Sequence, residues 1–193
     1  MSVAAANPPF GRLILVIGPE GLLIDRAVAD LCLQMRSEAP EVEISAIEAA
    51  RLDRGTLLEI TGPSLFSSRR AAVIYELENV SPDLGQDLVD LASEKLSDLA
   101  IILVHGGGAK GKGLVDKVKS AGAEVIECAA VKAWELPQFV SAEVKQAGSS
   151  IEAGAAAALV DAVGHDLRAL AAAVTQLISD GQGGPLTVDQ VRR

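Results

Sequence analysis

The residues with the clearest chemical signature are Gly106 to Lys112, which read G-G-G-A-K-G-K. This spacing matches G-x-x-x-x-G-K, a loop that cradles nucleotide phosphates with backbone N–H groups and a lysine. A working loop of this kind continues with Ser or Thr, because that hydroxyl binds Mg²⁺. Here the next residue is Gly113. The sequence therefore predicts a phosphate loop that lacks its metal-binding hydroxyl.

The position of the motif is a second difficulty. In nucleotide-binding folds the phosphate loop follows the first strand, and there this chain has Gly18-Pro19-Glu20-Gly21. That turn offers no Lys, Ser or Thr, and the charge of Glu20 repels phosphate. The acidic strand end that would complete a metal site, with Glu76 and Glu78, comes before the glycine loop instead of after it.

Two interpretations of the glycine loop stay open. It is either a flexible connection from strand to helix, or a weak contact for an anion or a nucleic-acid backbone through Lys110 and Lys112. The alternative function is a P-loop-type NTPase or small-molecule kinase that uses Gly106–Gly113. We favour the flexible connection and the weak contact over this catalytic alternative.

No other constellation of catalytic or metal-binding residues stands out. His105 and His165 have no nucleophile at a suitable spacing, and Cys32 and Cys128 lie far apart in apolar runs without a CxxC pattern. Two buried free thiols are the simplest interpretation of the cysteines. We expect no catalytic residue, no cofactor and no metal.

Composition restricts the class of protein. The 193 residues carry a net charge of −9 and are 49% hydrophobic but only 3% aromatic, which predicts an aliphatic core. A surface this acidic argues against a protein that grips duplex DNA with a whole face, because that needs clustered Lys and Arg. Without a signal peptide or a run of about 20 apolar residues, we expect a soluble, cytoplasmic protein with no membrane partner.

Apolar runs alternate with amphipathic stretches through the first two-thirds of the chain. This alternation predicts a parallel sheet covered by helices on both faces. Beyond Pro137 the pattern is helical throughout, so we predict an α/β domain over residues 1–137 and a small helical domain over 138–193. The predicted strands are 12–17, 42–47, 71–77, 99–104 and 124–128.

Several segments resemble one family. Gly164 to Leu170 is similar to the lid motif of AAA+ clamp-loader subunits, and Ser64-Leu65-Phe66 with Arg69, just before an apolar strand, looks like the delta subunit of the bacterial DNA polymerase III clamp loader. The opening LILVIGPEGLLIDRAV, the segment VKAWELPQFVSAEVKQAG and the terminal LTVDQV agree with this resemblance. It extends over essentially the whole chain.

The resemblance implies a fold and a function. The fold is an AAA+-like α/β domain without a functional P-loop, followed by a helical lid; a full-length delta subunit continues into a collar domain, which would begin near Arg193. The implied function is that of a non-catalytic subunit of the DNA polymerase III holoenzyme, a nucleotidyltransferase complex. It binds the sliding clamp (the beta subunit) and helps to open it during DNA replication. Implied partners are the clamp, the ATPase and delta-prime subunits, and, indirectly or weakly, DNA.

The resemblance also implies a site. The Leu-Phe pair that enters a pocket on the clamp corresponds to Leu65 and Phe66, flanked by Ser64, Arg69 and Arg70. The alternative is that Leu65 and Phe66 belong to the core of their own domain. Arg69 and Arg70 either make polar contacts at the rim of the interface or pair with an acidic neighbour such as Glu76.

Overall fold

The computed structural model describes residues 9–62, 68–94, 96–152, 154–181 and 184–192. Contacts divide the chain into two compact units, with the boundary between Ala130 and Val131. The change to an all-helical pattern predicts a boundary at residue 137. Helix α5 (Leu136–Gln146) begins just before that point and packs against other helices of the second unit, with Leu136 only 1% exposed. A boundary at 130 therefore keeps this helix whole.

The first unit is built on one five-stranded sheet. Its strands are β1 (Arg12–Ile17), β2 (Glu43–Glu48), β3 (Arg70–Tyr75), β4 (Leu99–His105) and β5 (Glu124–Glu127). They lie in the order β2-β3-β4-β1-β5, and every pair is parallel. The prediction of a parallel sheet is confirmed.

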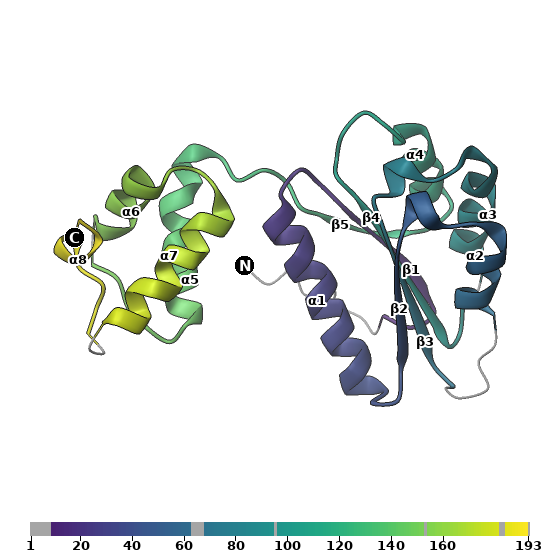
Figure 1. Ribbon diagram of the computed structural model, residues 1–193, viewed down its shortest axis with the longest axis horizontal. Coiled ribbons are helices and arrows are strands. Elements are labelled where there is room, and N and C mark those ends of the chain that lie inside the picture. Colours follow the sequence, from purple (N-terminus) through teal and green to yellow (C-terminus); the bar gives the residue numbers. More distant parts are fainter. Residues whose placement is uncertain (1–8, 63–67, 95, 153, 182–183, 193) are drawn as a thin grey trace. The chain divides into compact units, whose positions relative to one another are not determined.

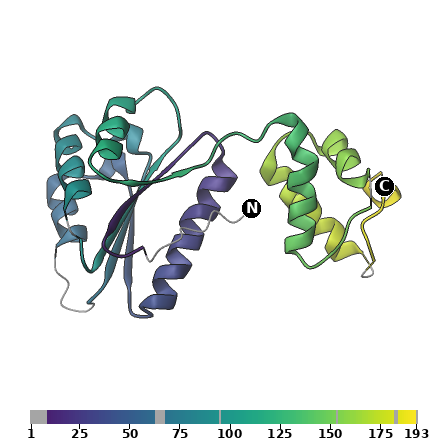
Figure 2. The ribbon, with the colours of Figure 1, turned by 180° about the vertical axis from the view of Figure 1, so that it is seen from behind.

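Helices cover both faces of this sheet (Figures 1 and 2). Helix α1 (Gly21–Glu38) lies on one face, and the other face carries α2 (Arg54–Thr61), α3 (Pro82–Ser93) and α4 (Lys112–Ser120). Two short 3₁₀ helices, η1 (Ala49–Arg51) and η2 (Leu77–Asn79), follow β2 and β3.

The core follows the twofold alternation of side chains along a strand. In β1, Leu13 and Leu15 belong to the cluster under α2, α3 and α4, while Ile14 and Val16 belong to the cluster under α1. The central strand β4 is buried along its whole length, down to His105. Burial of an aliphatic side chain contributes about 1.5–3 kcal/mol, so these two layers hold the strand ends in place.

The second unit is helical. It contains η3 (Ala133–Glu135), α5, α6 (Ala155–Val163), α7 (Leu167–Asp180) and the short α8 (Val188–Val191). The Asp166 carboxylate accepts a hydrogen bond from the Ala169 N–H at 2.8 Å and so caps α7. Among the described residues, no helix is long and apolar enough to span a bilayer.

Candidate functional site

Four segments meet at the carboxyl edge of the sheet, where ligands bind in open α/β folds. They are the turn after β1, the η2 turn after β3, the glycine loop Gly106–Gly113 after β4, and Cys128 after β5. The strand order puts β1 between β4 and β5. A nucleotide site in this unit would have to be built from these segments.

The turn between β1 and α1 has few N–H groups left for a phosphate. The Gly18 N–H donates to the carbonyl of His105 at 3.1 Å, and the Glu20 N–H donates to the carbonyl of Cys128 at 3.3 Å. Pro19 has no N–H to give. The turn therefore lacks the row of convergent donors that a phosphate-binding turn presents.

The same turn is packed against its neighbours without spare room. A Cβ built on Gly18 would lie 1.9 Å from the carbonyl oxygen of Cys128, and one on Gly107 would lie 2.8 Å from the carbonyl carbon of Gly18. Gly107 also has a φ of +76°, a conformation that favours glycine. Glycine at these positions permits close contact between three backbone segments.

His105 organises the beginning of the glycine loop. Its ring is 1% exposed, Nδ1 accepts a hydrogen bond from the Gly107 N–H at 2.9 Å, and Nε2 lies 2.8 Å from the carbonyl oxygen of Lys110. An N–H must point at Nδ1 and a carbonyl must receive a proton from Nε2, so these contacts select the neutral Nε2–H tautomer. His105 serves here as a structural residue that closes the loop.

The η2 turn also forms hydrogen bonds with the glycine loop. The Glu78 carboxylate accepts a hydrogen bond from the Gly106 N–H at 3.4 Å, and the Lys110 ammonium donates to Asn79 Oδ1 at 2.5 Å. Asn79 in turn donates from Nδ2 to the Glu76 carboxylate at 2.8 Å. Glu76 has a φ of +54°, and no other non-glycine residue in the described parts of the chain has a positive φ.

These contacts disfavour nucleotide chemistry. Glu78, in the η2 turn, accepts a hydrogen bond from a loop N–H, and Lys110 donates to the side-chain amide of Asn79. Lys112 is exposed and lines a depression of about 340 Å³ together with His105, Gly108 and Lys119. The structure brings Lys110 and Lys112 to one loop, but only Lys112 faces this depression.

The predicted clamp-binding residues Ser64, Leu65 and Phe66 lie outside the described residues. The structure does describe the two ends of their segment. Gly62 caps α2, and a Cβ there would lie 2.5 Å from the Leu58 carbonyl oxygen. The segment therefore begins at a position that accommodates only glycine without a shift of the backbone.

Arg69 and Arg70 both have partners inside the first unit. Arg69 forms an ion pair with Glu38, and its guanidinium lies 4.7 Å from the centre of the Phe10 ring. Arg70 donates to the carbonyl oxygens of Ile60 at 3.3 Å and Thr61 at 3.0 Å. Arg70 thereby links the start of β3 to the end of α2.

Sequence reasoning did not single out three exposed apolar side chains, of which Leu33 on α1 is 62% exposed. Leu58 on α2 is 65% exposed, and Trp134 in η3 is 74% exposed with the Lys132 ammonium 5.0 Å from its ring centre. Leu57 and Leu58 are neighbours in α2, and the side chains of adjacent helical residues point about 100° apart, so the two leucines have different surroundings. Leu57 is 4% exposed and belongs to the core.

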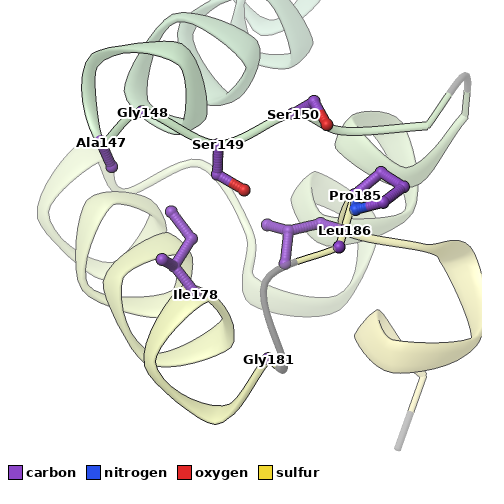
Figure 3. A pocket seen from close by; sticks show the side chains of 9 residues that line it. Ala147, Gly148, Ser149, Ser150, Ile178, Gly181, Pro185 and Leu186 are labelled. Carbon is purple, nitrogen blue, oxygen red and sulfur yellow. The ribbon is translucent and has the colours of Figure 1, made fainter.

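The second unit has a depression of about 400 Å³ between the ends of α5 and α7. Ser149, Ile178 and Leu186 surround it (Figure 3), and none of its lining residues is charged. It therefore offers no acid or base for catalysis. Arg168, within the segment that resembles a lid motif, lies exposed in the first turn of α7.

Burial raises the pKa of both Cys32 and Cys128 above the usual range. At Cys32 burial outweighs the opposite effect of the nearby Arg36 charge, so the surroundings of both cysteines favour the protonated thiol. Both are free cysteines. In the described parts of the chain, no cluster of three His, Cys, Asp or Glu side chains could hold a metal ion.

Comparison with known proteins identifies the fold. No family model matches the sequence. No curated protein matches it either. Among solved structures, the chain is similar to the Bacillus subtilis DNA clamp loader delta protein (YqeN), with a TM-score of 0.63 at 17% identity over 95% of this chain and 57% of that one.

Two further structures share the architecture. The Thermotoga maritima RuvB Holliday junction branch migration motor has a TM-score of 0.58 at 15% identity over 95% of this chain and 60% of its own. Domain III of the Thermotoga maritima replication initiation protein DnaA has a TM-score of 0.56 at 10% identity over 95% of this chain and 83% of its own. The chain thus spans less than two-thirds of the clamp loader protein and of RuvB. Its fold is the AAA+-like α/β fold that the sequence predicted, the fold of a clamp loader delta protein among others.

Proposed function

We propose that this chain is a non-catalytic clamp-loader subunit that binds the sliding clamp and helps to open it during DNA replication. The observation that carries the proposal is the similarity of fold to a DNA clamp loader delta protein over 95% of the chain. At 17% identity this similarity concerns the fold, so the function depends on the residues of this chain as well.

The carboxyl edge of the sheet supports a role without nucleotide hydrolysis. In the turn after β1, the N–H groups of Gly18 and Glu20 donate hydrogen bonds to backbone carbonyls. The Glu78 carboxylate accepts a hydrogen bond from the glycine loop. A protein with this edge can contribute to a complex through binding surfaces more readily than through catalysis.

The proposed clamp-binding residues are Leu65 and Phe66, with Ser64 beside them. Two large apolar side chains are typical anchors of a protein interface. Arg70 holds the carbonyls of Ile60 and Thr61, so both ends of the segment are fixed to the body of the unit. We assign Arg69 and Arg70 the role of flanking this segment, with Leu58 as an added apolar contact on α2.

The test is binding to the sliding clamp encoded by the same genome. We expect the wild-type chain to bind and the double variant Leu65→Ala/Phe66→Ala to lose at least about a hundredfold in affinity, since each anchor contributes roughly 2 kcal/mol or more. Leu33→Ala/Trp134→Ala is a matched control, because it likewise truncates one leucine and one aromatic residue, and both of these side chains are exposed.

The possible outcomes distinguish the proposed function from the proposed binding residues. An equal loss of clamp affinity in the control variant would indicate nonspecific hydrophobic association. Clamp binding that survives Leu65→Ala/Phe66→Ala would place the interface elsewhere. A folded wild-type chain that does not bind the clamp at all would overturn the proposed function.

The NTPase or kinase alternative predicts a different result. Nucleotide at a hundred times its dissociation constant would stabilise the fold by about 2.7 kcal/mol. We expect ATP with Mg²⁺ to leave the melting temperature unchanged. A scaffold that binds neither clamp nor nucleotide would fail both assays.

A further inference from the structure

The sheet of the first unit ends in an open strand. In the order β2-β3-β4-β1-β5, strand β2 has a neighbouring strand on one side only. Its register with β3 runs without interruption from Glu43, opposite Arg70, to Glu48, opposite Tyr75. An edge strand presents a row of unpaired N–H and C=O groups, to which a further strand can be added.

The direction of the backbone groups along β2 follows from one hydrogen bond. The Glu43 N–H donates to the carbonyl oxygen of Arg69 at 3.3 Å, so the backbone groups of Glu43 face β3. Because this direction alternates along a strand, those of Ser45 also face β3, whereas those of Ile44 and Ala46 face away from the sheet. Within the described chain, the backbone groups of Ile44 and Ala46 have no hydrogen-bond partner on that side. Ala46 is exposed, so the middle of the edge is accessible.

This edge lacks most of the features that keep edge strands from pairing. Such strands are usually very short, or they carry a proline, a bulge or a central lysine. Strand β2 has six residues without Pro or Gly, its register is regular, and its four central residues read Ile-Ser-Ala-Ile. The opposite edge strand, β5, has four residues, and Glu124 at its start pairs with Arg12. Strand β2 is therefore the edge better suited to pairing.

Carboxylates stand at both ends of this edge. Residues 37–50 contain four glutamates and no Lys or Arg, and two of these glutamates, Glu43 and Glu48, are the end residues of β2. Both are exposed, and because they are five positions apart their side chains lie on opposite faces of the sheet. An added strand would therefore meet one carboxylate near each of its ends, one on each face.

The basic side chains nearest to these carboxylates do not lie on the edge itself. Arg70 stands beside Glu43 on β3, one strand further in, and its guanidinium donates to two carbonyl oxygens at the end of α2. Arg51 lies beyond the end of β2, in η1, and forms no ion pair with any described residue. Together with Glu48 it lines a depression of about 380 Å³, which leaves room for a long side chain at this end of the edge.

We propose that β2 binds an extended basic segment of a partner protein, which extends the five-stranded sheet by one strand through the outward backbone groups of Ile44 and Ala46. Basic side chains of that segment pair with Glu43 and Glu48. A second copy of the chain does not suit this edge, because full antiparallel overlap of two β2 strands would place Glu43 of each opposite Glu48 of the other, and like charges directly opposite are destabilising. The inference goes beyond clamp binding and does not depend on it.

The test uses the peptide acetyl-Lys-Thr-Val-Thr-Val-Lys-amide as a probe, because its lysines have the same spacing as Glu43 and Glu48. NMR titration of the ¹⁵N-labelled 193-residue chain measures the affinity and locates the site. We expect a Kd below about 1 mM, with new protection from hydrogen exchange at the amides of Ile44 and Ala46. The Ser45 amide, which faces β3, should gain none. Absence of binding, or changes confined to other residues, would overturn the proposal.

Methylation of the probe backbone tests strand addition without any change to the chain. Hydrogen bonds to β2 use the N–H groups of alternate probe residues. Two probes are therefore compared, each N-methylated on one of the two alternate sets. One should lose at least about tenfold in affinity, and the other should bind like the unmethylated probe. Equal affinities of the two methylated probes would contradict strand addition and overturn the proposal.

The role of charge is tested on both partners. A probe with Glu in place of both lysines should bind at least about tenfold more weakly. Glu43→Gln/Glu48→Gln should weaken binding of the lysine probe about fivefold. The matched control Glu94→Gln/Glu152→Gln removes two exposed carboxylates elsewhere and should leave the affinity unchanged. Equal weakening in both variants would show that only net charge matters and would overturn the proposal.

A variant of the edge separates this site from other possibilities. Ala46→Pro removes the outward N–H and leaves the groups that face β3, so it should weaken probe binding at least about tenfold. If the chain alone sediments as a dimer that Ala46→Pro dissociates, the edge binds a second copy and the proposal is overturned. Ala46→Pro should bind the clamp like the wild type, and Leu65→Ala/Phe66→Ala should bind the probe like the wild type. Failure of one proposal is thus distinguishable from failure of the other.

Discussion

The Nδ1 atom of His105 accepts a hydrogen bond from the Gly107 N–H at 2.9 Å, across the end of the central strand. The opposite nitrogen, Nε2, reaches the carbonyl oxygen of Lys110 at 2.8 Å. One buried imidazole thereby fixes both the entry to the glycine loop and the turn before α4. The loop that resembles a phosphate loop is thus held in its conformation by hydrogen bonds to a histidine side chain.

Replacement of His105 should loosen this loop. We expect His105→Ala to lower the free energy of unfolding by about 2–4 kcal/mol, since it removes two hydrogen bonds and leaves a cavity. Urea denaturation measures this loss. Replacement of His165, an exposed histidine in the second unit, is the control and should change stability by less than about 0.5 kcal/mol. Equal stability of both variants would contradict the role of His105.

The contact between Gly18 and Cys128 predicts a large steric effect. A methyl group on Gly18 would lie 1.9 Å from the Cys128 carbonyl oxygen, and a backbone atom cannot rotate away. We expect Gly18→Ala to destabilise the fold by about 3 kcal/mol or more. Gly113→Ala makes a useful comparison, because its Cβ would meet nothing within 4 Å in helix α4. Similar melting temperatures for the two variants would show that β1 and β5 can separate at little cost.

The bond from Arg70 to the end of α2 predicts linked effects on stability and binding. Arg70→Met keeps most of the aliphatic stem but removes the donors to Ile60 and Thr61. We expect a loss of about 1–2 kcal/mol in unfolding free energy. If the segment that follows α2 binds the clamp, clamp affinity should fall as well.

A matched Arg51→Met variant tests whether this effect is specific. Arg51 is an exposed arginine of η1. Its replacement should leave stability and clamp affinity unchanged. An Arg70→Met chain with wild-type stability would show that the two hydrogen bonds contribute nothing measurable.

Asp53 predicts a pH dependence. Its carboxylate accepts a hydrogen bond from the Thr56 N–H at 2.7 Å at the start of α2, and this bond lowers the pKa of Asp53 below its ordinary value. The folded pKa lies below the unfolded one, so the contribution is present above the unfolded pKa of about 3.9 and is lost as pH falls through the folded pKa. Melting temperatures of wild type and Asp53→Asn between about pH 6 and pH 2 measure it. We expect a shallower acid decline in the variant, and parallel curves would contradict this.

Much of the fold could be predicted from the chain alone. The predicted strand over 12–17 coincides with β1, and the predicted strand over 99–104 lies within β4. These predictions succeed because apolar periodicity depends on residues within a few positions of the chain. Strand ends differ from the predicted ones by one or two residues, as in β3, which spans Arg70–Tyr75 where 71–77 was predicted. Contacts divide the chain between Ala130 and Val131, and Pro137 lies inside the first turn of α5.

The sequence by itself determined the elements of this protein and the incomplete chemistry of its glycine loop. A missing hydroxyl at Gly113 and a proline in the turn after β1 are local facts that no fold can change. Only the tertiary structure decided which residues meet that loop. The strand order places β4 between β1 and β3, so Gly18, Glu78 and Asn79 reach it from segments that are distant in sequence. Packing of aliphatic layers fixes that order, and contacts so far apart in the chain leave no periodic trace in the sequence.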